Sequence, residues 1–286
     1  MCGFRCNEVC PIMPVTITTQ SQMQRVRKAI KFCYLCGSLL TSGRRAQYGC
    51  NGEHVIPQAL FEDPPATDAW RPILDVHNEC HDQIKNAQGE QTAILLHKAQ
   101  LLDGDIADQG WAGNLKSLGL VLHAEYDPRL GRTLYMVKGF GDAHNAVWNW
   151  VRGLHASVYQ QYLPLQMKHK THAPMGELFI PEPGDTQHHR IGPEVFHEQK
   201  ARIARTLAAV TSLRRFDGLR CWGGRCQYLC VWIKKKGRDH MCVWGLSYDG
   251  VADYAEGTPF SGSPGWMGMY ECVRPPAKRT IAATIP

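Results

Sequence analysis

The sequence has no apolar run of about 18 residues, the length that a membrane-spanning helix requires. Its beginning also lacks the basic and then apolar segments of a signal peptide. We therefore expect a cytoplasmic protein that has no membrane partner. In that reducing compartment, the 12 cysteines are expected to bind metal or to stay as buried thiols rather than to form disulfides.

Acidic residues are scarce in one stretch of the chain. Residues 200–238 contain 11 lysines and arginines but a single acid, Asp217, whereas residues 1–104 contain 10 basic and 10 acidic residues. This concentration of positive charge favours contact with an anion, and DNA is the expected partner. The residues predicted to bind nucleic acid are Arg214, Arg215, Arg220, Arg225, Lys234, Lys235, Lys236 and Arg238.

Aromatic and sulfur-containing residues are interleaved with this basic stretch. In one interpretation, a nucleic-acid strand is held by phosphate contacts and by base stacking on Trp222, Tyr228, Trp232 and Trp244. In the other, these rings belong to a sheet that has a basic rim. The cysteines of this region show no doubled Cys-x-x-Cys pattern, so we expect them to be buried thiols. A second zinc site is the less favoured alternative. The residues concerned are Cys221, Cys226, Cys230, Cys242 and Cys272.

The length of 286 residues fits one large or two ordinary domains that can bury a hydrophobic core. We predict an α+β protein with a flexible arm at 1–16, a metal-binding domain at 17–104 and a mixed α/β domain at 105–286. Alternating and apolar patterns predict strands at 47–56, 73–76, 118–123, 133–138, 227–235 and 241–248. Helical periodicity and capping residues predict helices at 19–32, 77–102, 142–163 and 193–213, with a loop at 168–190.

The most specific pattern is a pair of metal-ligand motifs. Cys33 and Cys36 are three residues apart, and Gly37 lets the backbone turn so that both sulfurs can meet one ion. His77 and Cys80 have the same spacing, which completes a Cys3His set typical of a structural zinc site. Cys50 is an alternative fourth thiol. The polar segment between the two pairs needs such a metal site in order to fold.

A second set of residues lies between and just after these ligands. Glu53-His54-Val55-Ile56-Pro57 occupies a predicted strand, and His81 directly follows Cys80. Together with the two ligand pairs, this order resembles the HNH endonuclease superfamily, in the members that have a Cys-x-x-Cys zinc knuckle. The resemblance covers roughly residues 30–100 and implies a ββα-metal finger.

In that family, the histidine of the strand is the general base, and the acid before it and the helix residue hold one catalytic ion. Carried over, the resemblance implies His54 as the base, and Glu53 and His81 as ligands of Mg²⁺. The histidine at position 81 slightly favours a softer divalent ion, such as Mn²⁺, Ni²⁺ or Zn²⁺, over strict Mg²⁺. Alternatively, His77 and His81, four residues apart on one helix face, could both bind the catalytic ion, as in HNH toxins that lack the structural zinc.

The sequence thus predicts a metal-dependent endonuclease, a hydrolase of DNA phosphodiester bonds that nicks as a monomer. Restriction or antiviral defence is the expected role, because the basic stretch suggests separate targeting. The alternatives are a nuclease that acts on RNA and a non-catalytic zinc module that binds nucleic acid or a protein. Whether a homodimer or a protein partner takes part is left open.

Overall fold

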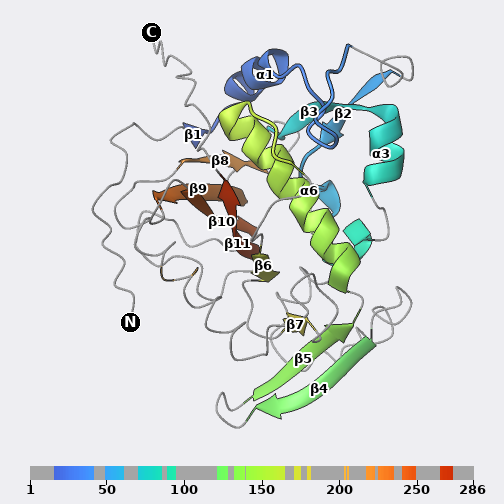
Figure 1. Ribbon diagram of the computed structural model, residues 1–286, viewed down its shortest axis with the longest axis vertical. Helices are drawn as coiled ribbons and strands as arrows, with labels where there is room; N and C mark the ends of the chain where they lie inside the picture. Colours follow the sequence, from blue (N-terminus) through green and yellow to red (C-terminus); the bar gives the residue numbers. More distant parts are fainter. Residues whose placement is uncertain are drawn as a thin grey trace.

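The computed structural model describes residues 16–41, 49–60, 70–85, 89–94, 121–127, 132–138, 140–164, 171–174, 179–181, 203, 205, 217–222, 225–234, 240–248 and 265–272 (Figure 1). In this part of the chain the fold is α+β, as predicted, with a six-stranded, a two-stranded and a three-stranded sheet and few helices. Among the described residues, no helix is both long and apolar enough to span a membrane.

The largest sheet has the strand order β1-β8-β9-β10-β11-β6. Its strands are β1 (Thr16–Ile17), β8 (Asp217–Cys221), β9 (Cys226–Lys234), β10 (His240–Tyr248), β11 (Gly265–Cys272) and β6 (Thr171–Pro174). β1 pairs with β8 in parallel, and all other pairings are antiparallel. Consecutive residues of β9, such as Leu229 and Cys230, are both buried, so this sheet is covered on both faces.

Helix α6 (Phe140–Tyr159) packs along one face of this sheet (Figure 1). Large side chains of the helix and the sheet form hydrogen bonds with each other. The Tyr159 hydroxyl donates to Asp217 Oδ2 at 2.7 Å and accepts from Trp232 Nε1 at 2.9 Å. The Tyr270 hydroxyl lies 2.7 Å from His155 Nδ1. Burial lowers the pKa of His155 to about 3, so this histidine is neutral in the folded protein.

The N-terminal part forms a hairpin and a helix, which we call the finger. It comprises β2 (Cys50–His54), the short helix η1 (Gln58–Leu60), β3 (Ile73–His77) and α3 (Asn78–Ile84). The antiparallel register places Cys50 opposite His77 and Glu53 opposite Leu74. Helix α1 (Gln20–Ala29) begins at a Thr19 capping box, and Arg27 joins it to β3 through Asp75, with Nε 2.9 Å from Oδ1.

The finger and the large sheet share one hydrophobic core because α6 contacts both (Figure 1). A Cβ added at Gly153 of α6 would lie 2.5 Å from Val55 Cγ1, so glycine permits this close approach. Buried Arg152 donates from Nη2 to Leu35 O at 2.6 Å, and Leu35 lies between the first two cysteines of the metal-ligand pattern. Described residues on both sides of the predicted boundary at 104/105 therefore pack together.

The predicted elements need several corrections. The helix predicted at 77–102 is interrupted: α3 ends at Ile84, where the Lys85 backbone leaves the helical conformation, and residues 89–94 are helical again. The predicted loop at 168–190 contains β6 and β7 (Phe179–Pro181). Both strands contain proline and lie at the edge of a sheet, the position in which a strand tolerates proline.

Other elements agree with the sequence analysis or lie outside the described residues. α1, α6, β9, β10, β4 (Val121–Asp127) and β5 (Arg132–Lys138) were predicted within a few residues, and β4 and β5 form the third sheet with β7. β1 and β11 were not predicted. Of the helix predicted at 193–213, the structure describes residues 203 and 205, which are helical. The predicted arm at 1–16 is described only at Thr16.

Candidate metal centre and active site

The first two cysteines are presented by a tight turn that follows α1. Gly37 has φ +81°, and its N–H donates to Cys33 O at 2.7 Å. The Cys33 N–H in turn donates to Ser38 O at 2.9 Å, and Phe32 and Leu39 form an antiparallel bridge. The backbone thus folds back on itself, which places the two sulfurs on the same side of the turn.

His77, the last residue of β3, and Cys80, in the first turn of α3, complete the group, which we call the thiol cluster (Cys33, Cys36, His77 and Cys80). Their ligand atoms all lie within 4.8 Å of one another. His77 Nδ1 is 3.6 Å from Cys36 Sγ and 3.8 Å from Cys80 Sγ. Sulfur and nitrogen ligands of one tetrahedral zinc ion lie about 3.6 Å apart. The cluster could therefore hold a metal ion, as predicted from the ligand spacing.

The orientation of the His77 ring is fixed from its other side. His77 Nε2 lies 3.2 Å from the carbonyl oxygen of Leu39. A hydrogen bond donated there leaves Nδ1 as the ligand atom, which is the usual arrangement of metal-binding histidines. Two alternatives are disfavoured by these positions. Cys50 is exposed, and its thiol donates to Leu40 O rather than joining the cluster. His77 faces the sulfurs of Cys36 and Cys80 rather than His81.

The two thiols of the turn differ in acidity. Burial raises the pKa of the Cys33 thiol. Burial would also raise the pKa of Cys36, but hydrogen bonds from the Ser38 backbone and hydroxyl, and from Cys80 and His77, outweigh it and lower the pKa to about 6. Cys36 is therefore a thiolate at neutral pH, the form that binds metal.

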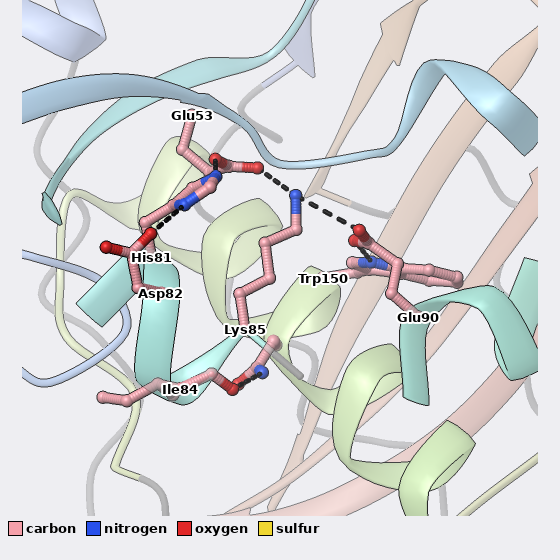
Figure 2. A network of polar contacts seen from close by, with 8 residues as sticks. Glu53, His81, Asp82, Ile84, Lys85, Glu90 and Trp150 are labelled. Atoms are coloured by element: carbon pink, nitrogen blue, oxygen red, sulfur yellow. Dashed lines mark hydrogen bonds and ion pairs between the residues drawn. The ribbon is translucent and has the colours of Figure 1, made fainter. Parts of the chain in front are cut away.

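A second group of charged residues lies on the same hairpin and helix, and we call it the carboxylate cluster (Glu53, His81, Lys85 and Glu90). Glu53 Oε2 lies 2.9 Å from His81 Nε2, and His81 Nδ1 lies 3.1 Å from Asp82 Oδ1 (Figure 2). Two ligand atoms at 90° on an octahedral Mg²⁺ ion are about 3.0 Å apart. The Glu53 and His81 side chains are therefore close enough to share one ion, and the same distance is that of a direct ion pair between them.

The carboxylate cluster also contains two residues that sequence reasoning missed. The Lys85 ammonium pairs with Glu53 Oε1 and lies 3.3 Å from Glu90 Oε2. Glu90 accepts a hydrogen bond from Trp150 Nε1 of α6 at 3.1 Å (Figure 2). The four-residue spacing between His81 and Lys85 was an available signal, because in a helix of the predicted length it would place both side chains on one face. The contact with Glu90 depends on the break after α3 and had no such signal.

His54, the predicted base, lies beside residues from two distant segments. Its ring centroid is 6.0 Å from that of Trp222, and Arg71 Cζ lies 4.9 Å from the centroid of the Trp222 ring. Trp222 is buried, and its backbone N–H donates to Trp70 O at 3.0 Å. Burial, and then the nearby Arg71 guanidinium, lower the pKa of His54. His54 is therefore neutral at pH 7 and able to accept a proton.

The residues predicted to bind nucleic acid are described only in part. Arg220 on β8 is exposed, Arg225 is half-buried, and only the backbone of Lys234 is described. The other five lie outside the described residues: Arg214, Arg215, Lys235, Lys236 and Arg238.

The aromatic residues of this region are not free to stack on bases. Three of the rings, Trp222, Tyr228 and Trp244, are buried, and half-buried Trp232 packs edge-on against Tyr159. The structure therefore favours the alternative in which these rings belong to the core of a sheet.

The cysteines described in the C-terminal strands, Cys221, Cys226, Cys230 and Cys242, are buried, as predicted. Burial raises the pKa of Cys221 and of Cys242 well above the usual value, which keeps both thiols protonated. Cys226 and Cys230 are likewise fully buried. The side chain of Cys272 lies outside the described part. Within that part, the thiol cluster is the one group of three or more ligand residues close enough to hold a metal ion.

Comparisons of the chain with protein-family models, with curated proteins and with solved structures found no match. A Cys3His group also occurs in structural zinc sites of many kinds, so the thiol cluster alone does not define a class of protein. The carboxylate cluster and His54 are the features that carry information about a reaction.

Proposed function

We propose that the chain is a metal-dependent endonuclease of the HNH type, in which zinc at the thiol cluster stabilises a finger that hydrolyses DNA phosphodiester bonds. The observation that carries the proposal is the 2.9 Å contact between Glu53 Oε2 and His81 Nε2, on a hairpin and helix joined by a Cys3His group. His54, next to Glu53 on β2, is the neutral imidazole that the reaction needs.

In the proposed mechanism, Glu53 and His81 would hold a divalent ion, which when bound offsets charge on the phosphoryl group and on the leaving oxygen. His54 accepts a proton from the attacking water. The oxygen of that water forms a bond to phosphorus while the bond to the 3′ oxygen breaks. The products are a 5′ phosphate and a 3′ hydroxyl, which takes its proton from solvent. Arg71, which lies over the Trp222 ring, adds positive charge near the base.

The location of the basic stretch supports DNA as the substrate, and we propose a cytoplasmic role in restriction or antiviral defence. Exposed Arg220 lies on β8, only two residues before Trp222, whose ring neighbours His54. A duplex or strand bound at this end of β8 would therefore come close to His54. One finger contains one such cluster, so a monomer is expected to nick a single strand.

A conversion assay of supercoiled plasmid to open circle tests this proposal. Wild type is incubated with Mg²⁺, Mn²⁺, Ni²⁺ or a chelator, beside His54→Ala and the control Glu79→Gln on α3. We expect wild type and the control to nick the plasmid only when a divalent ion is present. His54→Ala should lose this activity while its zinc content stays unchanged. If the protein cleaves RNA strands but not DNA strands of matched sequence, the substrate is RNA.

The second candidate is a non-catalytic zinc module that binds nucleic acid or a protein. It is favoured by the pairing of Glu53 with Lys85, which balances the charge of this carboxylate without an ion. Absence of nicking with every ion, together with metal-independent binding of DNA by zinc-loaded protein, would establish the module and exclude the enzyme.

A further inference from the structure

Lys85 lies between two carboxylates in the candidate active site. Its ammonium pairs with Glu53 Oε1, while the other oxygen of the same carboxylate faces His81 Nε2 at 2.9 Å. The second acid, Glu90, lies 3.3 Å from the ammonium. The side chains of Lys85, Glu53 and Glu90 are only 18%, 6% and 16% exposed, so solvent screens their charges weakly.

The charges of this cluster create a competition. Two carboxylates and one ammonium leave one negative charge, which attracts a cation. A divalent ion bound to Glu53 and His81 would share the Glu53 carboxylate with the ammonium, and two cations at that distance repel each other strongly in a partly buried site. The ammonium of Lys85 and the divalent ion therefore cannot both bind Glu53 tightly at the same time.

The neighbouring contacts indicate which group moves. Glu90 is held in place by the hydrogen bond from Trp150 Nε1 at 3.1 Å, and Trp150 is a buried residue of α6 (Figure 2). Lys85 follows the last residue of α3 and has a long, flexible side chain. A small shift of the ammonium toward Glu90 would keep it paired and would free Glu53.

We infer that Lys85 is a built-in competitor for the catalytic ion, and that Glu90 is the carboxylate that receives the lysine when the ion binds. Lys85 is thereby a positioning residue that sets the affinity of the site for divalent ions. This inference rests on the ion site of the proposed function, but it concerns ion binding and is independent of whether phosphodiester cleavage follows.

Two substitutions are predicted to change ion affinity in opposite directions. Lys85→Met removes the competitor and is expected to tighten Mn²⁺ binding about tenfold. Glu90→Gln removes the alternative partner of the lysine, holds the ammonium on Glu53, and is expected to weaken Mn²⁺ binding about threefold or more. The matched controls are Lys28→Met on α1 and Glu79→Gln on α3, which remove the same charges elsewhere on the finger.

The experiment is a titration of zinc-loaded, full-length protein with Mn²⁺, with free Mn²⁺ measured by electron paramagnetic resonance. Zinc content and thermal melting verify that each variant is folded. Tightening in Lys85→Met and weakening in Glu90→Gln, with unchanged controls, would support the inference.

Other outcomes are equally decisive. Unchanged or weaker binding in Lys85→Met, tighter binding in Glu90→Gln, or no Mn²⁺ binding in any variant would overturn the competition. Plasmid nicking measured on the same samples judges the proposed function separately. If the Mn²⁺ affinities shift as expected but no variant nicks plasmid, Lys85 competes with the ion and the nuclease proposal is wrong. If wild type nicks plasmid but the affinities do not shift, the nuclease proposal stands and the inference about Lys85 is wrong.

Discussion

The thiol cluster and the carboxylate cluster are built on the same hairpin and helix, yet they differ in nearly every property that determines what a metal site does. The thiol cluster offers four ligands, and three of them, including His77, are buried. The carboxylate cluster offers Glu53 and His81, the histidine side chain is 42% exposed, and a lysine competes for the acid. Closed sites with four protein ligands stabilise structure, whereas sites with open positions bind water and substrate.

The two histidines show the same contrast at the level of one ring. His77 is held by a backbone carbonyl, that of Leu39, at 3.2 Å. His81 is held by two carboxylates, that of Glu53 at 2.9 Å and that of Asp82, whose side chain is 74% exposed, at 3.1 Å. A backbone contact is rigid and cannot be ionised or displaced, while an exposed carboxylate is screened by solvent. The ring of the first cluster is therefore fixed by the backbone, whereas that of the second is held by side-chain carboxylates alone.

The largest effect is expected from breaking the thiol cluster. Cys80→Ser removes one of four ligands and should release the metal, lowering the free energy of unfolding by at least about 3 kcal/mol, because binding to such a site is coupled to folding. Cys50→Ser is the matched control, since that thiol is exposed and outside the cluster. Zinc content and thermal unfolding measure both. Equal stability of the two variants would show that the cluster holds no structural metal.

The converse change leaves the thiol cluster intact and disables the carboxylate cluster. Glu53→Gln keeps the shape of the side chain but removes its charge, and plasmid nicking should fall by about 100-fold or more because the ion loses its anionic ligand. Zinc content should stay as in wild type. Glu79→Gln serves again as the control on α3. Full nicking activity in Glu53→Gln would place the reaction elsewhere in the chain.

A smaller effect is expected from the residue that orients His81. Asp82→Asn weakens the hydrogen-bond acceptor at His81 Nδ1 and should lower the affinity for Mn²⁺ by about tenfold or less. The expected loss is small for a residue that orients a metal ligand because Asp82 is exposed. The zinc-loaded thiol cluster should be unaffected. The measurement is the same Mn²⁺ titration. A loss as large as that of Glu53→Gln would mean that Asp82 itself binds the ion.

Sequence spacing predicted the thiol cluster well because its ligands occur in two short motifs. Cys33 and Cys36 lie in one turn, and His77 and Cys80 span a strand end and the first helical turn, so local geometry almost determines how each pair is presented. The family resemblance likewise assigned Glu53 and His81 to one site, as ligands of a catalytic ion, and the two side chains are in contact in the structure. The alternation of β9 and β10, and the apolar stripe of α6, were sufficient to locate those elements.

The missed features depend on contacts between distant segments. Glu90 reaches Lys85 because the helix breaks after Ile84, and Trp150 of α6 holds it from 60 residues away in sequence. Trp222 looked like a stacking platform in a basic segment, but it is buried against the finger, where it neighbours His54. No local pattern distinguishes a buried tryptophan from an exposed one in such a segment. Tertiary packing decides it.

The smallest expected effect concerns the electrostatics around His54. Burial is the main cause of its lowered pKa, Arg71 and Lys85 lower it further, and Glu53 opposes them. Arg71→Gln removes one positive charge beside the ring, so the pKa of His54 should rise toward its ordinary value of 6.5 in protein to which no divalent ion has been added. Arg25→Gln on α1 is the control.

A nuclear magnetic resonance titration of the His54 ring, assigned with His54→Gln, measures this shift. The sign follows from the charge: a neighbouring cation disfavours the imidazolium, so its removal favours protonation and raises the pKa. An unchanged or lower pKa in Arg71→Gln would show that the guanidinium does not face His54 in solution. The expected rise would instead show that Arg71 helps to keep the proposed base neutral, a role that nothing in the thiol cluster requires.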